Sequence, residues 1–205
     1  MKARPGAHGR DPKSTRPVIK PATEHRGEVR LIGGLFKRSK LPVLDRPGLR
    51  PTPDRVRETL FNWLGQDLAG WRVLDAFAGS GALGFEAASR GAAQVLLLER
   101  DGLLVDSLQA SAKRLGASHL NVQRSDAMRW MSTAAAASFE LVLLDPPFDA
   151  GLAGPAAALG APLVAPGGFL YLESAEPLTE LPAGLLAWRQ VKAGAVHAQL
   201  LRRAD

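Results

Sequence analysis

The stretch that decides the fold is DAFAGSGALG, residues 75–84. It follows a short apolar run at residues 73–74 and leads into a helical pattern over about residues 82–90. Gly79 and Gly81 allow the backbone to pass close to a ligand and present N–H groups at a helix N-terminus. Gly79 to Gly84 also matches GxGxxG, the dinucleotide fingerprint, which alone is a weak signal. The stretch predicts a ligand-binding turn between a strand and a helix.

Strand and helix patterns alternate on the C-terminal side of this turn. We expect further strands over residues 94–99, 119–122, 141–145, 168–173, 187–192 and 195–202, and helices over about 102–115 and 127–136. Continuous apolar strands separated by helices indicate a parallel sheet covered on both faces. The predicted fold is α/β and Rossmann-like, with a seven-stranded, mostly parallel sheet, helices on both faces and a small N-terminal β/helix element.

The N-terminal third divides into two predicted zones ahead of the main domain, residues 66–205. Residues 1–25 are rich in Pro, Lys and Arg and are interpreted as a flexible basic arm. Residues 26–65 are interpreted as a small RNA-contacting element. In it, strands over residues 29–32 and 35–37 flank two glycines, residues 41–44 form a third strand, and a helix begins with Thr52 as its N-cap.

Composition excludes several functional classes. The 205 residues contain no cysteine, which excludes disulfides and thiolate metal sites, and the four histidines form no ligand pair, so no metal is expected. No apolar run approaches the ~20 residues of a membrane span, and we expect a cytoplasmic monomer without membrane contact. Residues 1–60 hold 15 Lys and Arg against 6 Asp and Glu, whereas residues 61–205 hold 11 against 14. This asymmetry suggests a polyanionic partner for the N-terminal part.

Ligands of open parallel sheets bind beyond the carboxyl ends of the strands. Glu99 ends the second strand, about 20 residues after the glycine turn, where an acid binds ribose hydroxyls. NAD and S-adenosylmethionine both fit that pattern. Asp75 favours S-adenosylmethionine, because a carboxylate there repels a pyrophosphate but attracts a cationic amino-acid group. Asp126 and the Ala127 N–H can hydrogen-bond an adenine ring. The predicted cofactor-binding residues are Asp75, Phe77, Gly79, Ser80, Gly81, Glu99, Arg100, Asp126 and Ala127.

The predicted catalytic residues are Asp145, Pro146, Pro147 and Phe148, which follow the fourth strand. The lone pair of an exocyclic base amine is delocalised into the ring. The Asp145 carboxylate and the Pro146 carbonyl can accept its two N–H hydrogens and localise that lone pair. Phe148 offers a surface on which a base stacks. These residues predict a methyltransferase that acts on an amino group of a nucleic-acid base.

Together with these motifs, three further segments carry a resemblance to a known family: RLIGG from Arg30, GLRPT from Gly48 and DRVRETLFNWL from Asp54. The chain resembles the RsmD family of bacterial 16S ribosomal RNA guanine-N2 methyltransferases from about residue 28 onward. The resemblance implies S-adenosylmethionine as cofactor and 16S rRNA within the small ribosomal subunit, or an assembly intermediate, as substrate. Candidate RNA contacts in the basic N-terminal part are Arg30, Lys37, Arg38, Arg50, Arg55 and Arg57.

Three other functions remain open at the level of sequence. The same four residues after the fourth strand suit adenine-N6 methylation of DNA or RNA. The literal GxGxxG suits an NAD-dependent oxidoreductase. A non-catalytic RNA-binding or ribosome-assembly protein would keep the basic N-terminal part without using Asp145.

Overall fold

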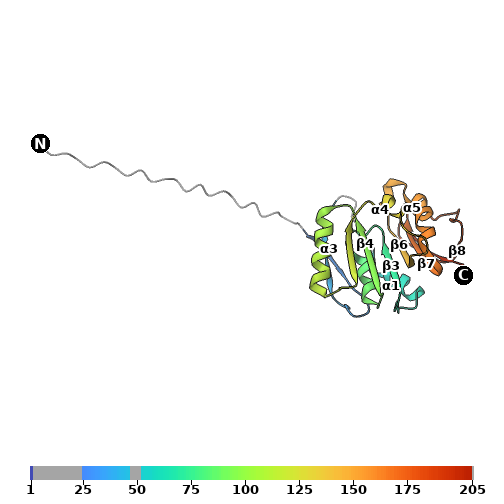
Figure 1. The fold of residues 1–205 in the computed structure, drawn as a ribbon, viewed down its shortest axis with the longest axis horizontal. Helices are drawn as coiled ribbons and strands as arrows, with labels where there is room; N and C mark the ends of the chain where they lie inside the picture. Colours follow the sequence, from blue (N-terminus) through green and yellow to red (C-terminus); the bar gives the residue numbers. More distant parts are fainter. Residues whose placement is uncertain (2–24, 47–51, 205) are drawn as a thin grey trace.

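The computed structural model describes Met1 and residues 25–46 and 52–204 (Figure 1). The strands are β1 (His25–Arg30), β2 (Lys40–Leu44), β3 (Arg72–Asp75), β4 (Gln94–Glu99), β5 (Leu120–Arg124), β6 (Phe139–Leu144), β7 (Val164–Ser174), β8 (Leu185–Ala193) and β9 (Val196–Arg203). The α-helices are α1 (Asp54–Trp63), α2 (Ala82–Ser89), α3 (Gly102–Leu115), α4 (Ala127–Met131) and α5 (Ala153–Gly160). Two 3₁₀ helices are η1 (Phe148–Ala150) and η2 (Ala161–Leu163).

The large sheet has seven strands in the order β5-β4-β3-β6-β7-β9-β8. The neighbours from β5 to β7 are parallel, and β9 runs antiparallel to both β7 and β8. The chain moves outward from β3 to β5 and then returns to β6 on the other side of β3. This reversal places a crevice at the carboxyl ends of β3 and β6, where ligands of such sheets bind. The predicted Rossmann-like fold is confirmed.

The N-terminal hairpin differs from the sequence expectation. Residues 35–37, predicted as a strand, lie in a turn, and β1 pairs instead with Lys40–Leu44, the run predicted as a third strand. The turn lies against the end of α2, where the Leu35 and Phe36 N–H groups donate to the carbonyl and hydroxyl oxygens of Ser89 at 2.6 and 2.8 Å. At Gly34, with φ +70°, a Cβ would lie 1.7 Å from the Ser89 carbonyl oxygen, so only glycine fits.

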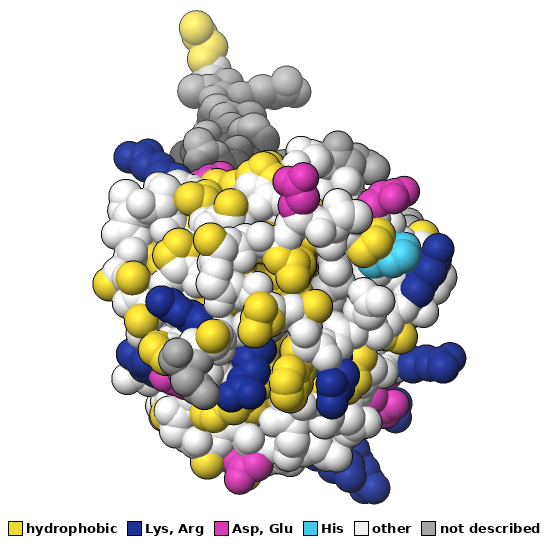
Figure 2. Space-filling model, turned by 90° about the vertical axis from the view of Figure 1, so that its right-hand side faces the viewer, with side chains coloured by type: hydrophobic (Ala, Val, Ile, Leu, Met, Phe, Trp, Pro, Cys, Tyr) yellow, Lys and Arg dark blue, Asp and Glu magenta, His cyan; other side chains and the backbone are white. Residues whose placement is uncertain are grey.

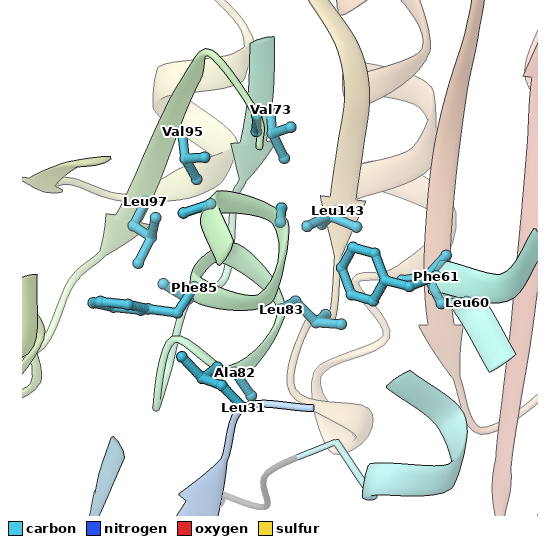
Figure 3. Packing of buried hydrophobic residues seen from close by; sticks show 14 of the residues in the cluster. Leu31, Leu60, Phe61, Val73, Ala82, Leu83, Phe85, Val95, Leu97 and Leu143 are labelled. Carbon is cyan, nitrogen blue, oxygen red and sulfur yellow. The ribbon is translucent and has the colours of Figure 1, made fainter. Parts of the chain in front are cut away.

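One hydrophobic core joins this hairpin and α1 to the large sheet. Leu31, Leu60 and Phe61 pack with side chains of α2 and of the central strands, among them Leu83, Phe85 and Leu143 (Figure 3). A second cluster fills the opposite face beneath α4 and α5. Burial of one such Leu or Phe side chain contributes roughly 1.5–3 kcal/mol. The N-terminal element is therefore fixed to the sheet by shared packing.

Two helices depart from prediction. The helix expected over residues 127–136 ends at Met131, because the hydroxyls of Ser132 and Thr133 donate to the Arg129 and Trp130 carbonyls at 2.8 and 3.2 Å and compete with the helix. The alanine-rich α5 was not predicted.

None of the helices in the described ranges is long and apolar enough to cross a membrane.

The outer strand β8 bears an exposed aromatic and cationic surface. Lys and Arg side chains are interspersed with hydrophobic ones on that side of the molecule (Figure 2). Trp188 is 40% exposed, and the guanidinium carbons of Arg189 and Arg202 lie 5.0 and 5.3 Å from its ring centroid. Charged side chains on an edge strand disfavour pairing with another sheet.

Candidate active site

A cavity of about 320 Å³ lies at the carboxyl ends of β3, β4, β5 and β6. Most of the residues predicted for cofactor binding and catalysis line it: Phe77, Gly79, Ser80, Glu99, Arg100, Asp126, Ala127, Asp145, Pro146, Pro147 and Phe148. These residues come from four separate strand ends, so the sheet topology brings together what the sequence separates. Asp75 and Gly81 lie behind the lining.

The glycine turn forms the floor of this cavity. The Ala78 N–H donates to the Leu98 carbonyl at 3.0 Å, which fixes the turn against β4. Gly81, with φ +79°, is the N-cap of α2, and a Cβ there would lie 2.6 Å from Leu108 and 2.7 Å from Phe85. Gly81 is therefore required by packing, and its role is to shape the turn.

Glu99 is held rigidly beside the turn. Its carboxylate accepts backbone N–H groups from Gly79 at 3.0 Å, Arg100 at 2.7 Å and Asp101 at 2.8 Å. The residue stays partly exposed to the cavity. A carboxylate fixed in this way can accept further hydrogen bonds from hydroxyl groups of a ligand.

Asp126 caps a helix with one carboxylate oxygen and can still accept hydrogen bonds from a ligand. It caps α4, and its Oδ1 accepts the Arg129 N–H at 2.9 Å. The residue is exposed on the cavity wall, and a carboxylate has capacity for further donors.

Asp75 ends β3 directly before the glycine turn, as predicted, but its carboxylate is buried beneath the cavity. It is 1% exposed, and its Oδ2 accepts the Gly84 N–H of α2 at 2.9 Å. Burial raises the pKa of Asp75 to about 7, with the Gly84 hydrogen bond opposing and the charge of Glu99 adding to this shift. Asp75 orients α2 from beneath the cavity, and direct contact with a cationic ligand group is not supported.

The segment Asp145–Phe148 forms the rim of the cavity. Pro146 is buried, whereas Pro147 is exposed and Phe148 is 38% exposed at the start of η1. Burial raises the pKa of Asp145 well above its ordinary value, and the charges of Glu173 and Asp75 add to this effect. An acid, a fixed turn and an accessible aromatic ring therefore meet at one edge of the cavity.

Thr52 lines the cavity and Glu173 lies next to Asp145, although sequence reasoning placed neither of them there. Thr52 was predicted to cap α1, but Pro53 takes the N-cap position, and the Thr52 hydroxyl donates to Asp145 Oδ2 at 3.3 Å. Glu173, near the end of β7, is 2% exposed and accepts the Tyr171 hydroxyl at 2.9 Å. Leu144 pairs with Leu172, so Asp145 and Glu173 each come one residue later at adjacent strand ends. That register is the signal that a sequence reading lacks.

Arg46 was also not predicted. It lines the cavity, and its Nε lies 3.2 Å from Asp101 Oδ2.

The predicted RNA contacts do not form one cluster. Arg30, Lys37, Arg38 and Arg55 are exposed, and Arg50 lies outside the described residues. Lys37 and Arg38 belong to the turn at the C-terminal end of α2, whereas the cavity lies at its N-terminal end. Lys37 instead borders a separate polar hollow of about 470 Å³.

Arg57 must be reassigned. It is fully buried, and its guanidinium donates to Asp54 at 2.6 Å, the Arg30 carbonyl at 2.9 Å and Glu86 at 3.4 Å. With its donors directed inward, Arg57 ties α1 to β1 and α2 and is not available to RNA.

The strand order, the glycine turn and the Asp-Pro-Pro-Phe rim define a class I methyltransferase, the class that uses S-adenosylmethionine. Residues 29–202 match the model of the family described as Conserved hypothetical protein 95. The chain belongs to this family, which is the RsmD family of methyltransferases.

Relatives and solved structures agree with this assignment. The chain is 47% identical over 133 residues to ribosomal RNA small subunit methyltransferase D of Escherichia coli (strain K12), covering 65% of this chain and 67% of that protein. The protein of the same name from Haemophilus influenzae is 45% identical to this chain over 139 residues, which cover 65% of this chain and 71% of that protein. Among solved structures, Escherichia coli yhhF superposes with a TM-score of 0.77 at 41% identity, covering 87% of this chain and 99% of that one. TrmN from Thermus thermophilus superposes with a TM-score of 0.63 at 26% identity, covering 77% of this chain and 50% of that one.

Proposed function

We propose that the protein methylates the exocyclic N2 amine of a guanine in 16S rRNA of the small ribosomal subunit, with S-adenosylmethionine as methyl donor. The observation that carries this proposal is the position of Asp145–Phe148 on the rim of the cavity that the glycine turn and Glu99 line. The names of the relatives, which are small-subunit rRNA methyltransferases, support the choice of RNA.

The cavity suits S-adenosylmethionine. Glu99, fixed by three backbone N–H groups, would accept the ribose hydroxyls, and Asp126 with the Ala127 N–H would bind the adenine edge. The glycine turn keeps side chains away from the floor, with Phe77 and Ser80 beside it. When bound, the cofactor supplies an electrophilic methyl group on a sulfonium centre, which becomes a neutral thioether once an amine nitrogen has taken the methyl.

The rim residues prepare the amine. The Asp145 carboxylate and the Pro146 carbonyl accept its two N–H hydrogens, which draws the nitrogen toward tetrahedral geometry and localises its lone pair. Asp145 is also the acceptor for the proton that the methylated nitrogen loses. Phe148, exposed at the rim, is the surface on which the base stacks, an interaction of about 1–3 kcal/mol in nucleic-acid complexes.

RNA contacts outside the cavity are assigned to exposed cations. Arg55, in the first turn of α1, lies close in sequence to Thr52 at the catalytic rim. Arg30, Lys37 and Arg38 would contact a more distant part of the RNA, because the turn that holds Lys37 and Arg38 lies at the other end of α2.

The test is nucleoside mass spectrometry of 16S rRNA from a strain that lacks the gene. We expect loss of N2-methylguanosine, restored by the wild-type gene and by Asp106→Asn on the exposed face of α3, but not by Asp145→Asn. Purified Asp145→Asn should bind S-adenosylhomocysteine normally while its kcat falls roughly 10²–10³-fold. Loss of N6-methyladenosine with unchanged N2-methylguanosine would replace guanine by adenine as the target. Tight binding of NADH in place of S-adenosylhomocysteine would reject the methyltransferase proposal.

A further inference from the structure

Three acidic side chains meet on one face of the sheet at its carboxyl edge. Asp75 ends β3, Asp145 follows β6 and Glu173 lies near the end of β7, and these three strands are neighbours in the sheet. The methyl-transfer step described above uses Asp145 alone. Asp75 has its own partner in the Gly84 N–H. Glu173 is nearly inaccessible to solvent, so its position beside Asp145 requires a physical account.

Thr52 connects Glu173 to Asp145. The Thr52 hydroxyl donates to Asp145 Oδ2 at 3.3 Å, and it also lies close enough to Glu173 to lower the pKa of that carboxyl group. A hydroxyl has one proton and two lone pairs. It can therefore donate a hydrogen bond to one carboxylate while accepting a hydrogen bond from the O–H of the other carboxyl group when that group is protonated. Thr52 itself is 5% exposed, so bulk water does not compete for these bonds.

The surroundings of the two carboxyl groups disfavour the state in which both are ionised. Burial raises the pKa of Glu173 to about 6, and the Tyr171 and Thr52 hydroxyls and the Arg57 guanidinium oppose that shift. Burial and the charges of Glu173 and Asp75 raise the pKa of Asp145, whereas the Thr52 hydroxyl lowers it. The charged and titratable groups facing the pair are thus Asp75, Tyr171 and Arg57. Two adjacent carboxyl groups, one buried and one opening onto the cavity, retain a proton between them to a higher pH than two separate groups would.

We propose that Glu173 is a positioning residue of this site: through the Thr52 hydroxyl it shares one proton with Asp145 and so sets the pH range in which Asp145 accepts the N–H groups of the substrate amine. This inference rests on the proposed function for the identity of the amine. The pair of carboxyl groups accounts for every proton in the reaction. Asp145 is ionised when the retained proton lies on Glu173, it takes the proton released by the methylated nitrogen, and the pair returns one proton to water after product release.

The test is the pH dependence of kcat for methyl transfer to small subunits that lack the modification. Glu173→Gln removes the like charge that holds Asp145 protonated. The acid limb of the kcat profile should therefore move to lower pH by on the order of one unit. Thr52→Val removes the hydrogen bond that favours ionised Asp145, so the limb should move to higher pH. Thr52→Ser keeps the hydroxyl and should restore the wild-type profile. Glu176→Gln, on an exposed residue beyond β7, serves as the remote control.

A purely structural role predicts a different pattern. It would lower the unfolding temperature of the variants but leave the acid limb where it is, so unchanged profiles would overturn the proposal. Movement of the Glu173→Gln and Thr52→Val profiles in the same direction would overturn the proposal as well. Unfolding temperature and affinity for S-adenosylhomocysteine are measured for every variant to separate folding from proton sharing.

A second readout does not depend on the RNA. In protein with ¹³C-labelled aspartate carboxyls, the Asp145 resonance is identified by its loss in Asp145→Asn and titrated without substrate. Its midpoint should fall in Glu173→Gln and rise in Thr52→Val. Equal midpoints in the variants and the wild type would reject the shared proton, whatever the enzyme methylates. Absence of N2-methylguanosine formation by the wild type would reject the proposed function alone.

Discussion

At the scale of the residue, a buried carboxyl group links the stability of this protein to pH. The pKa of Asp75 is raised from 3.8 to about 7 in the folded state. Between these two values the folded protein holds a proton that the unfolded chain has released. The contribution of Asp75 to stability is therefore fully present below about pH 4, falls as pH rises and is lost above about pH 7. Asp145 and Glu173, whose pKa values are also raised, act in the same direction.

Asp75→Asn should make this dependence shallower. The amide oxygen can still accept the Gly84 N–H but carries no charge, so between pH 5 and pH 8 the variant should gain about 3 kcal/mol of stability relative to the wild type. Urea unfolding at several pH values measures this difference. Asp106→Asn on α3 is the matched surface control. Parallel stability curves for Asp75→Asn and the wild type would contradict the prediction.

At the scale of the element, one buried acid joins the N-terminal hairpin and α1 to α2. Glu86 is fully buried and accepts the Ile32 and Gly33 N–H groups, both at 2.8 Å. It also accepts the guanidinium groups of Arg57 at 3.4 Å and Arg90 at 2.9 Å. Removal of one partner from such a pair leaves a charge in the core, which is why breaking it destabilises by about 3–5 kcal/mol.

Two arginines of the same helix therefore predict opposite behaviour. Arg57→Ala should lower the free energy of unfolding by roughly 3 kcal/mol. Arg55→Ala, two residues away and exposed, should change it by less than about 0.5 kcal/mol while weakening RNA binding. Chemical denaturation and RNA-binding titrations measure the two effects. A stable Arg57→Ala protein with weakened RNA binding would restore Arg57 as a surface contact.

Elements with a strong local pattern could be predicted from the sequence, and those fixed by distant contacts could not. The strands and the glycine turn follow from continuous apolar runs and from Gly79 and Gly81. The turn at residues 35–37 looks like a strand locally, and its bonds to Ser89, more than 50 positions away, decide its shape. The places of Thr52 and Glu173 beside Asp145 could not be predicted for the same reason, because Thr52 contacts Asp145 across 93 positions of the sequence.

At the scale of the whole molecule, positive charge is concentrated in the N-terminal part of the chain. Residues 2–24 hold six Lys and Arg against two Asp and Glu. If all six contact phosphates of single-stranded RNA, they contribute up to about 4 to the slope of log K against log salt. Replacing the six by Gln in the full chain should reduce that slope and leave affinity for S-adenosylhomocysteine unchanged. An unchanged salt slope would show that residues 2–24 do not bind RNA.

The three carboxyl groups at the edge of the sheet also lead to a prediction about product inhibition. They create negative potential beside the cavity, and that potential strengthens as they ionise. S-adenosylmethionine carries a sulfonium charge, whereas S-adenosylhomocysteine does not, so a site with this potential should bind the methyl donor more tightly than the by-product. This preference should grow from pH 6 to pH 8. We therefore expect S-adenosylhomocysteine to inhibit the enzyme less at pH 8 than at pH 6, which inhibition assays at the two pH values would measure.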